Sequence, residues 1–182
     1  MPAQPQISAD DHVVTLNPIV GMSLEDLARV GIDVLQAGIS HPMMAAEHLL
    51  RFNRALVEVV LGTSAQEPPA GDRRFQDEGY RSSAIHSRLM RGWLALDSTV
   101  NEWVQSMGFE GNELERARFV AALATDAVAP SNFLLGNPAA LRKARESRGA
   151  SLLAGLSNLV NDLRHNHGMP SQVDKSAFTV GE

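Results

Sequence analysis

The chain has 182 residues, of which 44% are hydrophobic and 20% are charged, and its formal net charge is -5. This length suffices for one domain with a sizeable core, and the composition is not that of a disordered chain. The acidic balance disfavours a nucleic-acid partner, because phosphate neutralisation needs clustered Lys and Arg. Without cysteine, the chain has no disulfide, no thiolate metal ligand and no cysteine nucleophile.

Residues 1–16 are predicted to form a mobile polar arm that ends at the turn Asn17-Pro18. They contain neither the basic nor the apolar segment of a secretory signal. The chain has no run of about 18 apolar residues, so no membrane-spanning helix is predicted. We therefore expect a cytoplasmic protein.

The first two helices have local start and stop signals. Ser23 is a predicted N-cap with Asp26 as its capping-box partner, and Gly38 is a predicted stop. The second helix is expected to begin near Pro42, where a missing N–H costs little, and to end at Gly62. The apolar face predicted for the first helix consists of Leu24, Leu27, Ala28, Gly31, Val34 and Leu35.

The third helix is predicted over residues 83–107, and Gly108 is its stop signal. The fourth helix is expected to be capped by Asn112, with Glu115 at N3, and to end before Pro130. The inward stripe of the third helix is predicted to contain Ile85, Leu89, Trp93, Leu96, Val100, Trp103 and Met107.

Two shorter helices complete the predicted fold. Asn137-Pro138 is expected to open the fifth helix, which Gly149 closes. Ser151 is expected to cap the sixth helix, with Gly168 as its stop. The residues that the sixth helix is predicted to turn inward are Leu152, Leu156, Leu159 and Leu163. The sequence thus predicts an all-α, irregular bundle of roughly six helices over residues 17–168, with an extended tail over residues 169–182.

A search for catalytic motifs finds none. The string closest to a Gly-x-Ser-x-Gly nucleophile turn is residues 149–153, but Leu153 stands where the second glycine is needed. No phosphate-binding glycine loop is present. His165 and His167 are two residues apart, but a solvated helix end is a better interpretation than a metal site. We therefore predict no catalytic residue, no cofactor and no metal.

The string Asp72-Arg73-Arg74-Phe75 is predicted to be a loop pinned by Asp–Arg pairing, with its phenylalanine in the core. Tyr80 follows it and offers a large ring with a polar tip. Trp93 and Trp103 lie about 280° apart around a helix. The default prediction is that both rings lie in the core. The alternative is that one ring is partly exposed and available to a partner.

The order of these motifs resembles the N-terminal region of the polyhydroxyalkanoate synthases (poly-beta-hydroxybutyrate polymerases). It runs from Asn-Pro and Asp-Arg-Arg-Phe through Ala-Pro-Ser-Asn-Phe (129–133) and Gly-Ala-Ser-Leu (149–152) to Met-Pro-Ser-Gln-Val (169–173). Tyr80 replaces the tryptophan usual in the family. The candidate structural or interface residues are Asp72, Arg73, Arg74, Phe75, Tyr80, Trp93, Trp103, Asn132, Phe133, Asn137 and Pro138.

The resemblance implies a non-catalytic part of an acyltransferase. Family members polymerise (R)-3-hydroxyacyl-CoA with a Cys-Asp-His triad on a C-terminal α/β-hydrolase domain, and none of these residues can be carried over to this chain. We expect a truncated chain that is inactive alone, with residues 169–182 leading toward the absent domain. The implied roles are dimerisation, granule association and modulation of the catalytic domain on the same or a separate chain.

The implied partners are that catalytic domain, the polymer granule surface or granule proteins, and a second copy of the chain. The first two helices are the best candidates for an exposed apolar face, because they precede the loop at Pro68-Pro69. The alternative interpretation is a stand-alone helical protein that binds granules or acts as a scaffold.

Overall fold

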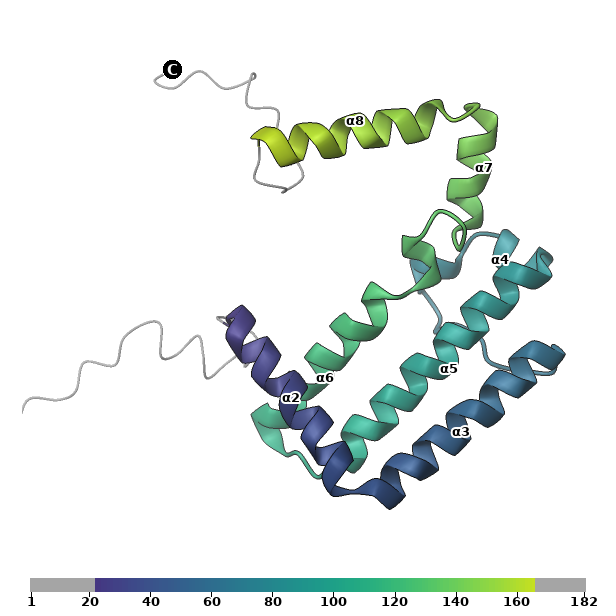
Figure 1. Ribbon diagram of the computed structural model, residues 1–182. Helices are drawn as coiled ribbons and strands as arrows, with labels where there is room; N and C mark the ends of the chain where they lie inside the picture. Colours follow the sequence, from purple (N-terminus) through teal and green to yellow (C-terminus); the bar gives the residue numbers. More distant parts are fainter. Residues whose placement is uncertain (1–21, 166–182) are drawn as a thin grey trace, which may run out of the picture. The chain divides into compact units, whose positions relative to one another are not determined.

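The computed structural model describes residues 22–165, which form α-helices and short 3-10 helices without a strand (Figure 1). The predicted all-α class is confirmed. The expected N-terminal arm, the stop at Gly168 and the C-terminal tail lie outside the described residues. The helices are α2 (Leu24–Ser40), α3 (Pro42–Leu61), η1 (Arg73–Phe75), α4 (Gly79–Ser82), α5 (Ala84–Ser106), α6 (Gly111–Ala127), η2 (Pro130–Asn132), α7 (Pro138–Glu146) and α8 (Ala150–His165).

Local signals place several helix ends where the sequence predicts them. The Ser23 Oγ accepts a hydrogen bond from the Asp26 N–H at 3.1 Å, and the Asp26 carboxylate accepts one from the Ser23 N–H at 3.0 Å. Pro42 is the first residue of α3. Gly62 ends α3 in the left-handed region, with φ of 76°, which glycine adopts without a steric cost.

Three predicted boundaries are wrong. Gly38 does not end α2, which runs on to Ser40; a Cβ at Gly38 would lie 2.9 Å from the Trp103 ring, so this glycine permits close helix packing. Asn112 is not a cap, because α6 begins one residue before it and has no side-chain cap hydrogen bond. Ser151 lies inside α8.

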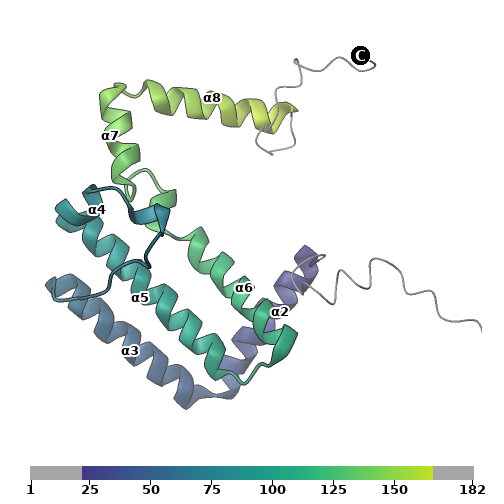
Figure 2. The same cartoon turned by 180° about the vertical axis from the view of Figure 1, so that it is seen from behind.

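The chain divides into two compact units, one through Asn137 and one from Pro138. In the first unit α5 lies between α3 and α6, as both views show (Figures 1 and 2). α2 packs on α6 and also contacts α3. One core cluster consists of Phe75, Tyr80, Met90, Trp93, Leu94 and Ala129. The other consists of Val104, Ala117 and Ala121, with partly buried side chains around them that include Val30, Val34 and Trp103.

Many apolar residues predicted to be buried are exposed. On α2, Leu24 and Leu35 are 84% and 69% exposed, because Val30 and Val34 are the side chains that pack on the core. On α5, Ile85 and Leu89 are exposed while Trp93 is buried. In the second unit the four leucines predicted to turn inward on α8 are all exposed. Among the described residues, no helix has both the length and the apolar content needed to cross a lipid bilayer.

Gly136 sits where the chain passes very close to itself. A Cβ at this position would lie 2.4 Å from the Pro130 carbonyl oxygen, which is shorter than any van der Waals contact. We expect Gly136→Ala to lower the free energy of unfolding by about 1–3 kcal/mol, because the backbone of residues 130–136 must shift. Urea unfolding followed by tryptophan fluorescence measures this unit, since Trp93 and Trp103 are the only tryptophans in the chain.

The matched control is Gly31→Ala in α2, where the nearest atom would be 4.0 Å from the new Cβ. Alanine is a better helix former than glycine by about 1 kcal/mol, so this variant should be neutral or stabilised. Equal stability of the two variants would contradict a steric role for Gly136.

Candidate functional site

The Asp-Arg-Arg-Phe string forms a clamp around the Arg74 guanidinium. Asp72 caps η1 by accepting the Arg74 N–H at 3.0 Å, and its carboxylate pairs with the Arg74 side chain at 2.9 Å. The same guanidinium donates to the Asp126 carboxylate at the end of α6. One arginine therefore links the loop after α3 to α6.

Aromatic rings extend this clamp into the core. The Arg74 guanidinium lies 4.5 Å from the centre of the Trp93 ring, in a cation–π geometry. Phe75 packs against Trp93 and Tyr80, with ring centres 5.3 Å and 5.0 Å away. The Trp93 N–H donates to the Thr125 carbonyl at 2.8 Å, so the ring is fixed on both its edge and its face.

Polar contacts also hold the segment between α6 and α7. The buried Tyr80 hydroxyl donates to the Gly136 carbonyl at 3.0 Å. The Asn132 side-chain amide donates to the Asp126 carbonyl at 2.7 Å, and that of Asn137 donates to the Ser131 carbonyl at 2.8 Å. The motif and this segment, far apart in sequence, therefore form one structure.

Three of the candidate residues stand outside this structure. Arg73 is exposed. Pro138 begins α7 in the second unit. Trp103 lies near the other end of α5 and is only partly buried; its ring packs edge-on against the buried His48, with centres 5.5 Å apart. Trp93 thus lies in the core, as predicted by default, whereas Trp103 is partly exposed, as in the alternative.

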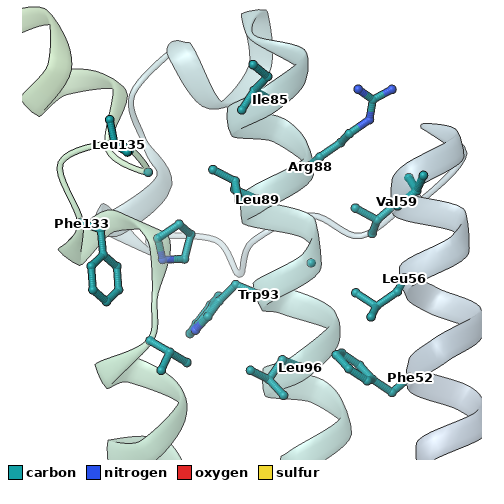
Figure 3. Close-up of a pocket in the computed structure, with 15 residues that line it drawn as sticks. Phe52, Leu56, Val59, Ile85, Arg88, Leu89, Trp93, Leu96, Phe133 and Leu135 are labelled. Carbon is teal, nitrogen blue, oxygen red and sulfur yellow. The ribbon is translucent and has the colours of Figure 1, made fainter.

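An apolar groove of about 780 Å³ lies beside the clamp, across α5 and between α3 and the segment 130–136 (Figure 3). This volume is within the range of roughly 300–1,000 Å³ typical of small-molecule sites. Trp93 and Phe133 are candidate residues that line it. Its other lining residues are Phe52, Leu56, Val59, Val60, Ile85, Arg88, Leu89, Gly92, Leu96, Val128, Pro130, Leu135 and Gly136.

The sequence analysis missed this groove, because Ile85 and Leu89 fit an ordinary core stripe. Arg88 is its one charged lining residue. A groove with apolar walls and a single cation can bind a ligand or a partner, and it presents no acid–base pair for chemistry. Among residues 22–165, no cluster of three or more acidic or histidine side chains is placed to hold a metal.

The electrostatics of the clamp favour its charged form. The hydrogen bond from the Arg74 side chain holds the pKa of Asp72 below its ordinary value, and the same contact raises the pKa of Arg74. Burial raises the pKa of the Tyr80 hydroxyl, which therefore stays protonated and able to donate.

A family model for the poly-beta-hydroxybutyrate polymerase (PhaC) N-terminus matches residues 71–182, which begin just before the clamp. The chain belongs to this family. The resemblance seen in the order of the motifs is confirmed.

Relatives extend the similarity to α2 and α3. Poly(3-hydroxyalkanoate) polymerase 1 of Ectopseudomonas oleovorans is 37% identical over 177 residues, which cover 97% of this chain and 32% of the relative. Poly(3-hydroxyalkanoate) polymerase 2 of the same organism is 36% identical, over 91% of this chain and 29% of the relative. The poly(3-hydroxyalkanoate) polymerase subunit PhaC of Cupriavidus necator is 34% identical, over 66% of this chain and 20% of the relative. The chain spans less than a third of the length of these relatives, and no solved structure gives a significant match.

We expect the Asp72–Arg74 pair to make stability depend on pH. The pKa of Asp72 is lower in the folded protein than its ordinary value of 3.8. The pair therefore contributes fully to stability above pH 3.8, and this contribution is lost as pH falls through the lower pKa of the folded state. Asp72→Asn should therefore be less stable than the parent at pH 7, and the gap should narrow as pH falls below about 4. Urea midpoints from pH 7 to pH 3 measure this, with the exposed Asp33→Asn as control. A gap that stays constant over this range would contradict it.

Tyr80→Phe removes the hydrogen bond to a buried carbonyl while keeping the ring that packs on Phe75. The expected loss in unfolding free energy is about 1–3 kcal/mol, because the buried Gly136 carbonyl loses its hydroxyl partner. Chemical denaturation of the two proteins gives the difference. An unchanged midpoint would mean that the hydroxyl does not hold the segment.

Proposed function

We propose that this chain is a non-catalytic N-terminal domain of a polyhydroxyalkanoate synthase that modulates the catalytic domain polymerising (R)-3-hydroxyacyl-CoA. The observation that carries the proposal is the coverage: similarity extends over 97% of this chain but only 32% of a polymerase. The chain also lacks a cysteine, the residue that the family uses as its nucleophile. Chemistry is therefore assigned to the remaining part of the polymerase.

The outer face of α2 and α3 is the proposed contact surface. α2 has no buried residue, and α3 has only His48 and Val59. Exposed apolar side chains in such number are unfavourable in water and are typical of interaction sites. We define the outer face as Ile32, Leu35, Ile39, Met43, Leu50 and Val57, which are between 51% and 84% exposed.

The catalytic domain is the preferred partner because it accompanies this region in the polymerases. Dimerisation and granule association would use the same kind of apolar surface, and they are the competing outcomes of the experiment. A stand-alone granule-binding or scaffold role is the alternative function, and it would require no effect on catalysis.

The test is CoA release from (R)-3-hydroxyacyl-CoA by the separately expressed catalytic domain of a relative, with and without this chain. We expect no turnover by the chain alone, and a shorter lag or faster release in the mixture. Leu35→Glu/Ile39→Glu, two exposed side chains one turn apart on the outer face, should abolish the stimulation by placing charge in the contact.

Leu123→Glu on α6 is the matched control, since it adds the same charge at an exposed leucine of another helix and should retain stimulation. Turnover by the chain alone would refute a non-catalytic role. An unstimulated mixture, with the chain found on polymer granules or as a dimer by sedimentation, would refute modulation and favour the competing roles.

A further inference from the structure

The apolar groove beside the clamp has walls that face water. Among its lining residues, Ile85 is 68% exposed, Leu135 is 76% exposed, and Leu89 on α5 is 43% exposed. Concave apolar surface of this kind is unfavourable in water and is typical of a binding site. Arg88, the one charged residue of the lining, points toward the end of α3, where a Cβ on Gly62 would lie 4.0 Å from its Nη2 (Figure 3). The groove therefore fits an apolar segment that carries negative charge at the α3 side.

A segment with this chemistry lies shortly before α2. Val13, Val14 and Leu16 are apolar, and Asp11 and Asp10 stand two and three positions before the first valine. β-branched valines favour an extended backbone, which can lie along a groove. The two carboxylates supply charge complementary to the one cation of the groove.

Contacts of α2 place the start of this helix within reach of the groove. A Cβ on Gly31 would lie 4.0 Å from the Val120 side chain, so the middle of α2 rests on α6. At 1.5 Å per residue, the path from there is about 10 Å back to Leu24 and about 12 Å forward along α6 to Val128, which lines the groove. The eight residues from Leu24 back to Leu16 span up to about 27 Å when extended. Leu16 can therefore reach Val128, and the residues before it can cross the groove.

We propose that residues 10–16 occupy the groove of the same chain in an extended conformation. Leu16 lies nearest the lining residue Val128, where the path from α2 arrives. The two valines cover Leu89 on α5, and the two aspartates lie beside Arg88. Part of the arm that the sequence predicts to be mobile is then held on the first unit.

Tethering makes modest contacts sufficient for this arrangement. A short flexible linker holds two sites at an effective concentration on the order of millimolar, so the arm needs only weak intrinsic affinity for the groove. A free apolar ligand or a partner would have to displace it. The inference concerns one chain alone and does not rest on the proposed function.

Distances between spin labels test this directly in the full chain, which has no cysteine of its own. Thr15→Cys labels the arm without removing an apolar side chain, and Ser82→Cys labels an exposed position three residues before the lining residue Ile85. We expect double electron–electron resonance to give one narrow distance distribution for this pair. A broad distribution would overturn the proposal.

Variants of the doubly labelled chain show whether the groove is what holds the arm. Leu89→Glu places a charge in the groove and should abolish the narrow distribution. Leu123→Glu, at a leucine of similar exposure that does not line the groove, should keep it. In the arm, Val14→Asp should abolish it and Gln6→Asp, outside residues 10–16, should keep it. A narrow distribution that survives Leu89→Glu would overturn docking in the groove, and circular dichroism establishes that each variant is folded.

Other occupants of the groove are outcomes of the same measurement. A short distance between separately labelled chains, after mixing, would place the arm on a second copy and would overturn docking within one chain. Ser176→Cys in place of Thr15→Cys reports on residues 166–182, which belong to the other compact unit. A narrow distance for that label, with a broad one for the arm, would assign the groove to the C-terminal segment instead.

The aspartates are tested by charge. Asp10→Asn/Asp11→Asn should reduce the population with the narrow distance, and raised salt should do the same, because both weaken the attraction to Arg88. A population unchanged by both would overturn the part assigned to the aspartates.

Discussion

The contact between the Arg74 guanidinium and the Trp93 ring organises the first unit. Arg74 is anchored by carboxylates from two separate segments, Asp72 and Asp126, and its charge lies against one face of the indole. A cation–π contact is strengthened where water is excluded, and Trp93 is only 5% exposed. Because Trp93 belongs to α5, this contact joins the loop after α3, the central helix and the end of α6.

The groove follows from the way this contact is built. Trp93 is held by Arg74 on its face, by Phe75 and by the Thr125 carbonyl at its edge, and it lines the groove as well. The wall formed by residues 130–136 is tied to the same cluster through Tyr80 and Gly136. The opposite wall, on α3, and the other α5 side chains that line the groove lie outside the clamp. One wall of the groove and the Trp93 ring are therefore tied to the same cluster of contacts.

Signals confined to a few residues could be interpreted from the sequence alone. Ser23 with Asp26, Pro42 and Gly62 each determine a helix end through their own backbone and side-chain chemistry. Gly38 could not be interpreted in this way. From its neighbours in sequence it has the appearance of a helix stop, but its role is to permit contact with Trp103, which is 65 positions away. The candidate residues Asp72, Phe75 and Tyr80 could be named from a motif, but the hydrogen bond from Tyr80 to Gly136 could not. The groove could not be predicted from the sequence, because Ile85 and Leu89 have the spacing of core residues whether or not another helix covers them.

The exposed apolar side chains of α2, α3 and α8 also bear on colloidal behaviour. Leucines and isoleucines on these helices face water in a chain whose net charge is only -5. Electrostatic repulsion between copies opposes their association, and salt at about 0.1–0.15 M limits the range of that repulsion to about 8–10 Å. We therefore expect association between copies of this chain to depend on concentration and ionic strength, and a partner that covers the apolar faces to remove that dependence.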